Sequence, residues 1–191
     1  MRKALQSFGI LDDSDIEWLA SAGKVRFIPD GATLVEEATQ LNEVFILIEG
    51  ALEVVLLSGK RVHIATLLPG EVIGEISFVD GRAASASVIA THDSHVFAIP
   101  HQEVVQKLAI DPSFASRFYR AIASFLADRL AVTVSRFGYG SHSQDIDPDA
   151  LNDGQMEVIS IGAQRFDMLL KHLRRTHSSG SFASSTSSFM V

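Results

Sequence analysis

The sequence contains no cysteine among its 191 residues. Disulfide bonds, thiol catalysis and cysteine-ligated zinc sites are therefore excluded, and the absence fits the cytoplasmic location that we expect. Lysine and arginine total 16 against 23 aspartate and glutamate residues, which gives a net charge of −7. Nonspecific binding to nucleic acid requires an excess of cations that can displace counterions, and this acidic chain does not have one.

Long apolar runs are also missing. The first fifteen residues, MRKALQSFGILDDSD, contain only a short apolar stretch and soon become acidic, so we expect neither a signal peptide nor a membrane span. Apolar residues nevertheless make up 47% of the chain. A chain of this length and composition can fold around a substantial core.

The residues that are present change in pattern along the chain. Residues 1–24 predict short helices. Residues 25–100 contain short β-branched or aromatic runs that are separated by glycine about every ten residues, a pattern typical of a β-sandwich or barrel. Residues 101–137 predict a short helix and then a long one, in which apolar side chains recur at three- and four-residue steps.

The remainder of the chain divides into three segments. Residues 138–154 are polar, acidic and contain glycine, which predicts a linker. Residues 155–175 predict an amphipathic helix, with basic residues at its C-terminal end. Residues 176–191 are rich in serine, and we expect this tail to be disordered.

The most informative stretch is residues 70–90, GEVIGEISFVDGRAASASVIA. Gly74 and Glu75 interrupt a strand-like run, and the small side chains of residues 83–86 would leave backbone N–H groups uncovered. Exposed amides in a tight turn form a natural anion-binding nest. A nearby carboxylate could accept hydrogen bonds from sugar hydroxyl groups.

This stretch resembles the phosphate-binding cassette of cyclic nucleotide-binding domains. That module is shared by bacterial catabolite-activator regulators, the regulatory subunits of cyclic-nucleotide-dependent kinases and gated channels. In the family a Gly-Glu pair follows a strand, and the glutamate holds the ribose 2′-hydroxyl. An arginine then pairs with the cyclic phosphate and is followed by two small residues. Gly74 and Glu75 match the first pair, and Ser85 and Ala86 match the second.

In this register the family's arginine position falls on Ala84. The cassette contains one arginine, Arg82, two residues earlier. A guanidinium group is long enough to reach back, but the forked geometry of a strong arginine–phosphate pair would have to be rebuilt. The ligand-binding residues that the resemblance implies are Ile73, Gly74, Glu75, Ile76, Ser77, Arg82, Ala84, Ser85 and Ala86.

The resemblance also implies a fold, mainly β with α. We expect one domain over residues 1–137, a double-stranded β-helix jelly roll at 25–100 flanked by N-terminal helices and by a hinge and C-helix at 101–137. One extra C-terminal helix would follow. A DNA-binding helix-turn-helix needs two helices, and only one is expected after the C-helix. We therefore expect a stand-alone, bacterial type of this family that does not bind DNA.

The function implied is that of a regulatory sensor for cyclic AMP, cyclic GMP or a related ligand. Movement of the C-helix would pass the signal to an effector protein or to a second copy in a homodimer formed through residues 113–137. We expect no enzymatic activity, no catalytic residue, no metal and no cofactor. One alternative is a degenerate module that acts as a protein-interaction or assembly domain. The other is a cupin-type metal enzyme, although the spacing of His92 and His95 does not fit a cupin metal site.

Overall fold

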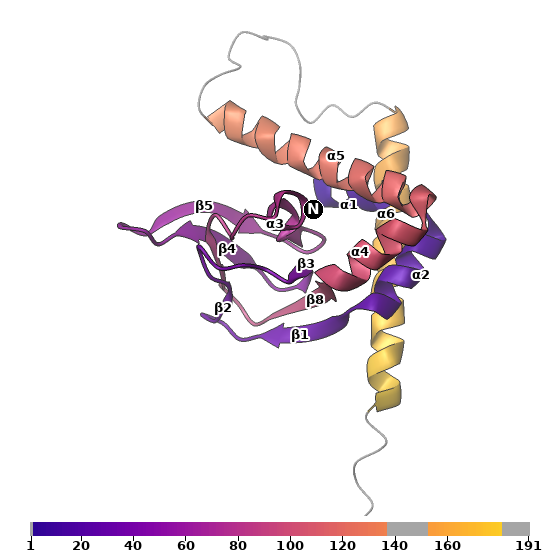
Figure 1. Cartoon of the computed structure of the whole chain (residues 1–191), viewed down its shortest axis with the longest axis horizontal. Coiled ribbons are helices and arrows are strands. Elements are labelled where there is room, and N and C mark those ends of the chain that lie inside the picture. The colour runs from indigo at the N-terminus through magenta and orange to yellow at the C-terminus, as the bar shows by residue number, and fades with distance from the viewer. Residues whose placement is uncertain (1, 137–152, 181–191) are drawn as a thin grey trace, which may run out of the picture.

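The computed structural model describes residues 2–136 and 153–180. Its elements in chain order are α1 (Arg2–Ile10), α2 (Asp13–Ala22), β1 (Lys24–Ile28), β2 (Thr33–Val35), β3 (Glu43–Glu49), β4 (Leu52–Leu56), β5 (Val62–Leu67), β6 (Val72–Ile73), α3 (Glu75–Asp80), β7 (Ser87–Ala90), β8 (Ser94–Pro100), α4 (His101–Ile110), α5 (Pro112–Arg136) and α6 (Asp153–Gly180). The strands form a roll, and the larger helices gather around one end of it (Figure 1). The predicted jelly roll with flanking helices is confirmed.

Two four-stranded antiparallel sheets make up the roll, with strand orders β1-β8-β3-β6 and β2-β7-β4-β5. Side chains from both sheets fill the space between them. Phe45 and Leu47 of β3, Val96 of β8, and Leu52 and Val88 from the second sheet belong to this inner core. These side chains follow the alternation expected for strands with one face toward a core.

A second core lies between the first sheet and the helices. Ile46 of β3 and Phe97 and Ile99 of β8 point away from the inner core and pack with Phe114 and Ile16 of the helical layer. The central strands β3 and β8 of the first sheet are therefore buried on both faces. This burial explains why β3 has the sequence EVFILIE, a nearly continuous apolar run rather than an alternating one.

The predicted C-terminal helix is present but longer than expected. The sequence predicts residues 155–175, whereas α6 runs from Asp153 to Gly180 and so includes the first part of the predicted serine-rich tail. Residues 181–191 of that tail lie outside the described residues, as do all but the last two residues of the predicted linker.

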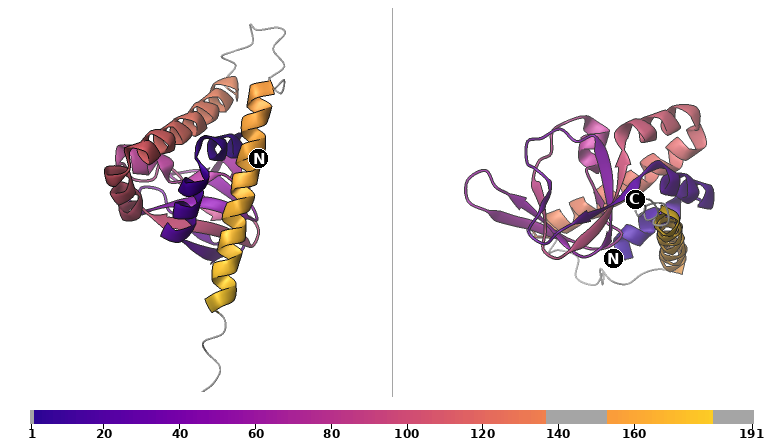
Figure 2. Two further views of the ribbon diagram at one scale, coloured as in Figure 1. Left: turned by 90° about the vertical axis from the view of Figure 1, so that its right-hand side faces the viewer. Right: turned by 90° about the horizontal axis from the view of Figure 1, so that it is seen from below.

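Helix α6 packs along α1 and α2 (Figure 2). Gly162 faces α1 so closely that a Cβ atom at this position would lie 1.6 Å from the backbone oxygen of Leu5. The rings of Phe8 and Phe166 contact each other at a centroid distance of 5.3 Å. The Arg165 side chain donates to Asp13 and to the backbone oxygen of Gly9, both at 2.9 Å. The extra helix is thus part of the second core.

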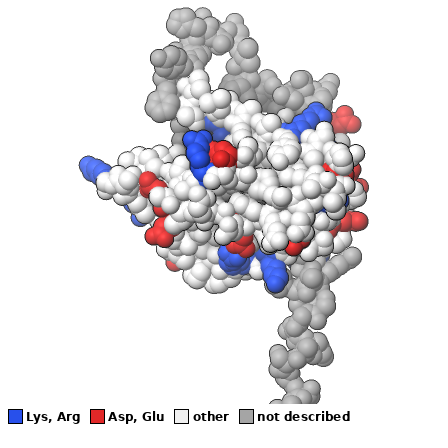
Figure 3. Space-filling model, viewed as in Figure 1, with Lys and Arg blue, Asp and Glu red and all other residues white. Residues whose placement is uncertain are grey.

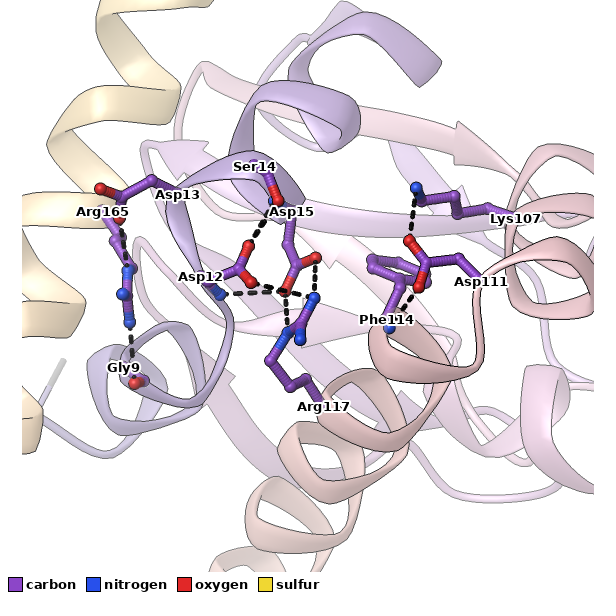
Figure 4. A network of polar contacts seen from close by, with 10 residues as sticks. All are labelled: Gly9, Asp12, Asp13, Ser14, Asp15, Lys107, Asp111, Phe114, Arg117 and Arg165. Atoms are coloured by element: carbon purple, nitrogen blue, oxygen red, sulfur yellow. Dashed lines mark hydrogen bonds and ion pairs between the residues drawn. The ribbon is translucent and has the colours of Figure 1, made fainter.

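A polar network fixes the beginning of α5 to α2 (Figure 4). Asp12 and Asp15 form a capping box at the start of α2. Arg117 of α5 donates to both carboxylate oxygens of the buried Asp15, at 2.6 and 2.8 Å. Since the Asp15 carboxylate is only 2% exposed, removal of this partner would leave a charge buried and uncompensated.

The apolar face of α5 is largely satisfied within the chain. The sequence predicts a homodimer through residues 113–137, but Phe118 and Phe125 are only 8% and 4% exposed in the single chain. The buried side chains of α5 pack against α1 and the sheet, so this apolar face is not evidence of a dimer. Tyr119, Leu130 and Val134 are the large apolar side chains of α5 that remain exposed in the described part of the chain.

Candidate functional site

The candidate site begins where strand β6 ends. Gly74 follows Ile73 in the left-handed conformation, with φ of 87°, and places Glu75 at the start of α3. A Cβ atom on Gly74 would lie 3.1 Å from the backbone oxygen of Glu43. Because the positive φ disfavours L side chains and the neighbouring backbone leaves little room, this turn requires glycine.

The turn and the loop before β7 together line one pocket inside the roll. Eight of the nine predicted ligand-binding residues lie in its wall, all except Arg82. Apolar side chains from strands and loops form much of the remaining surface. The complete lining consists of Val35, Leu41, Val54, Leu67, Ile73, Gly74, Glu75, Ile76, Ser77, Ala84, Ser85, Ala86, Val88 and Arg129.

Glu75 is the carboxylate of this pocket and is only 1% exposed. Burial raises the pKa of its carboxyl group above the ordinary value, while the nearby Arg129 guanidinium lowers it and Glu71 raises it. The Oε1 atom of Glu75 accepts a hydrogen bond from Nη1 of Arg129 at 2.5 Å. Glu75 can therefore act as a buried hydrogen-bond acceptor with one charged partner.

The small residues line the same pocket as Glu75 and lie in the loop that leads into β7. The N–H of Ala84 donates to the oxygen of Thr39, and its carbonyl accepts from the N–H of Ala38, both at 2.8 Å. These two bonds fix the loop. Ser85 is exposed and Ala86 is half-buried, so a ligand in the pocket could reach the Ser85 hydroxyl and the adjoining backbone.

Arg82 is not part of this pocket. Its Nε atom donates to Asp80 Oδ2 at 2.6 Å, its backbone N–H donates to Asp80 Oδ1 at 2.9 Å, and its side chain is 81% exposed. The backbone hydrogen bond and the guanidinium lower the pKa of the Asp80 carboxyl. The arginine thus stabilises the turn after α3.

Arg129 of α5 is the pocket residue that sequence reasoning missed. Its Nη2 atom donates to the backbone oxygen of Val72 at 3.0 Å, and its guanidinium lies 4.5 Å from the centre of the Phe125 ring. In the sequence, Arg129 could be noticed only because it occupies a position of the three- and four-residue repeat at which α5 otherwise has apolar side chains. That signal alone cannot identify its partner.

Other classes of site find little support in the described residues. Within residues 2–136 and 153–180, no group of three histidine, aspartate or glutamate side chains could hold a metal ion. No helix in the same ranges has the length and apolar character needed to cross a bilayer. On the face shown in Figure 3, basic and acidic side chains are scattered among uncharged residues and form no continuous basic patch.

Residues 25–111 match the family model described as the cyclic nucleotide-binding domain. This part of the chain is therefore similar to the cyclic nucleotide-binding domain, and the roll described above agrees with that likeness. Among solved structures, a cyclic nucleotide-binding domain from Methylobacillus flagellatus has a TM-score of 0.63 with 20% identity, covering 71% of this chain and 78% of that one. At that identity the likeness establishes the fold alone.

Two further similarities come from signalling proteins. The Pycsar effector protein XpPycTIR of Xanthomonas perforans is 32% identical over 116 residues, which cover 60% of this chain and 36% of that protein. A structure titled for a cyclic-GMP-dependent signalling pathway in bacterial phytopathogenesis has a TM-score of 0.50 with 25% identity, covering 66% of this chain and 95% of that one. The present chain thus spans about a third of the length of XpPycTIR.

Proposed function

We propose that this cyclic nucleotide-binding domain is a regulatory sensor for cyclic AMP or cyclic GMP. The observation that carries the proposal is the buried carboxylate of Glu75, which lines one pocket with the small residues Ala84, Ser85 and Ala86. A pocket that contains both a buried acceptor and a loop of short side chains suits a ligand that carries sugar hydroxyls and a small anion.

In the bound state Glu75 would accept a hydrogen bond from the ribose 2′-hydroxyl. The hydroxyl of Ser85 and the backbone beside it would face the cyclic phosphate. The apolar side chains of Val35, Val54 and Val88 offer a surface for the base or the sugar ring. The polar contacts would fix the orientation of the ligand, and the apolar wall would bury the rest of it.

The output would pass through α5, because this helix supplies Arg129 to the pocket wall. A ligand changes a protein's conformation only by binding one arrangement better than another. Contact with Arg129 gives the ligand such a preference for the position of α5. The recipient would be an effector protein or a second copy of the chain, and we place this exchange in the cytoplasm.

Calorimetric titration with cyclic AMP and cyclic GMP tests the proposal. We expect one site per chain, with affinity about ten- to a hundredfold weaker in Glu75→Gln, the range for loss of a hydrogen bond to a charged group. Glu53→Gln is the matched control. Glu53 pairs with Arg61 on the strand next to the pocket but does not line the pocket, so this variant should bind like the wild type.

The proposal fails if the folded wild type binds neither nucleotide at millimolar concentration. It also fails if Glu75→Gln and Glu53→Gln bind equally well, because Glu75 would then lie outside the site. In the first case the alternative of an interaction or assembly domain becomes the better account of this pocket.

A further inference from the structure

The charges around the pocket require a counterion for any anionic ligand. Glu75 lies in the pocket, and Glu71 is close enough to raise the pKa of the Glu75 carboxyl. Arg129 is the one cationic side chain among the pocket-lining residues in the described part of the chain. Without a cation, the one charged side chain that a phosphate would meet among the described lining residues is the Glu75 carboxylate, a group of the same sign.

Arg129 is already held in the pocket wall by groups that a ligand could replace. Nη1 donates to Glu75 at 2.5 Å and Nη2 donates to the oxygen of Val72 at 3.0 Å. The Phe125 ring supports one face of the guanidinium. The Arg129 side chain remains 35% exposed, whereas the Glu75 side chain is only 2% exposed, so the arginine has room to move and the glutamate does not.

We propose that Arg129 is the phosphate-binding residue of this site and that it exchanges the Glu75 carboxylate for the phosphate when a cyclic nucleotide binds. This inference rests on the proposed function and adds the identity of the cation. In the free protein Glu75 and Arg129 neutralise each other. In the complex the ribose hydroxyl donates to Glu75, and Arg129 turns to the phosphate.

Physical chemistry favours this exchange over two alternatives. A guanidinium binds phosphate through paired N–H groups, and its long side chain permits the change of partner. Arg82 is a poor substitute, because it is tied to Asp80 outside the pocket. An arginine that merely blocked the site would leave the phosphate without any charged partner among the described lining residues.

The exchange also gives α5 a direct role in ligand recognition. Arg129 lies twelve residues after Arg117, which is fixed to the buried Asp15. The start of α5 is therefore held to α2 while its later turns carry the proposed phosphate ligand. Movement of Arg129 toward a phosphate would shift the later turns relative to the roll.

The test compares the Arg129→Gln variant with wild type, using ligands with and without phosphate. We expect Arg129→Gln to weaken binding of cyclic AMP or cyclic GMP about ten- to a hundredfold, the range for a charge-assisted contact. Binding of the matching nucleoside, adenosine or guanosine, should stay equal or become tighter, because Glu75 is released. Arg82→Gln is the control and should leave both affinities within about twofold.

Three results would overturn the inference. If Arg129→Gln binds both the cyclic nucleotide and the nucleoside more tightly than wild type does, Arg129 only occludes the pocket in the free protein. If the substitution weakens both equally, or leaves both unchanged, the role of Arg129 is not in phosphate binding. If Arg82→Gln causes the loss instead, the cation is Arg82.

A second substitution, made to restore binding, distinguishes failure of this inference from failure of the proposed function. An arginine introduced by Ala84→Arg at the pocket wall should restore cyclic nucleotide binding to Arg129→Gln. If wild type binds and Arg129→Gln binds equally well, the pocket is a nucleotide site but Arg129 is not its cation. If neither binds although both melt cooperatively, the proposed function fails. Since Ala84 is only 7% exposed, Ser85→Arg at the exposed neighbouring position replaces it if Ala84→Arg does not fold.

Discussion

At the scale of single residues, Glu75 is unusual because its charge is buried in a pocket wall with one guanidinium partner. Burial raises the pKa of the Glu75 carboxyl above its ordinary value of 4.5. Burial likewise raises the pKa of the Glu71 carboxyl, which the Arg129 guanidinium lowers in part. The folded protein therefore binds protons at these two positions more tightly than the unfolded chain does.

This difference predicts how the free energy of unfolding depends on pH. The contribution of Glu75 is fully present below its ordinary pKa of 4.5 and is lost as pH rises through the raised pKa of the folded state. Glu75→Gln cannot titrate at this position. We therefore expect the unfolding free energy of the wild type, relative to Glu75→Gln, to decrease as pH rises above 4.5.

Urea denaturation of both proteins at a series of pH values measures this difference. A difference that is constant with pH, or that grows as pH rises, would show that Glu75 is not held in the buried position described. Glu71→Gln provides a second comparison, because burial raises the pKa of that carboxyl as well.

The residues of the pocket differ in how far the sequence could reveal them. The turn at Gly74-Glu75 and the small residues of 84–86 are local features, so a short stretch of sequence was enough to bring them together. Arg129 contacts Glu75 across a separation of 54 positions. Its partner depends on where α5 crosses the roll, and periodicity along one helix does not specify a crossing. The sequence likewise could not show that the Arg82 side chain pairs with Asp80, two residues away, and does not line the pocket.

At the scale of elements, the contact between α6 and α1 depends on a close approach of their two backbones. The sequence predicted α6 from its amphipathic pattern but gave no partner for it. The contact depends on two glycines, because a Cβ atom at Gly9 would lie 2.3 Å from the backbone oxygen of Val158 and one at Gly162 would lie 1.6 Å from that of Leu5. Neither glycine stands out in the sequence, since each lies inside a helix and marks no turn.

Gly162→Ala tests this packing. The added methyl group would overlap backbone atoms, which cannot rotate away, so α6 must separate from α1. We expect the free energy of unfolding to fall by about 1–3 kcal/mol, the range for overpacking, as measured by chemical denaturation. Ser160→Ala is the control, because Ser160 is exposed on the same helix. An alanine at 162 that stabilises the protein, as alanine would in an isolated helix, would contradict the described crossing.

At the scale of the whole molecule, the first sheet is shared by two cores, one inside the roll and one under the helices. Helix α5 connects the helical layer with the pocket. It begins beside α2, where Arg117 pairs with Asp15, and reaches the pocket at Arg129. Under the proposed function, α5 would connect a ligand in the roll to the helical layer.

Whether a second copy of the chain receives the signal is a separate question. Leu130 and Val134 are 63% and 39% exposed near the end of α5, whereas Phe118 and Phe125 are buried within the chain. The proposal of a dimer through this helix therefore depends on those later turns and not on Phe118 or Phe125.

Hydrogen–deuterium exchange with and without saturating cyclic AMP or cyclic GMP tests the central claim most directly, because it locates the ligand as well as detecting it. The account predicts slower exchange at residues 74–77 and 84–86 and altered exchange in α5 around Arg129, with the turns near Arg117 unchanged. Protection confined to other segments, such as the contact between α1 and α6, or binding without any change at the pocket, would contradict the account.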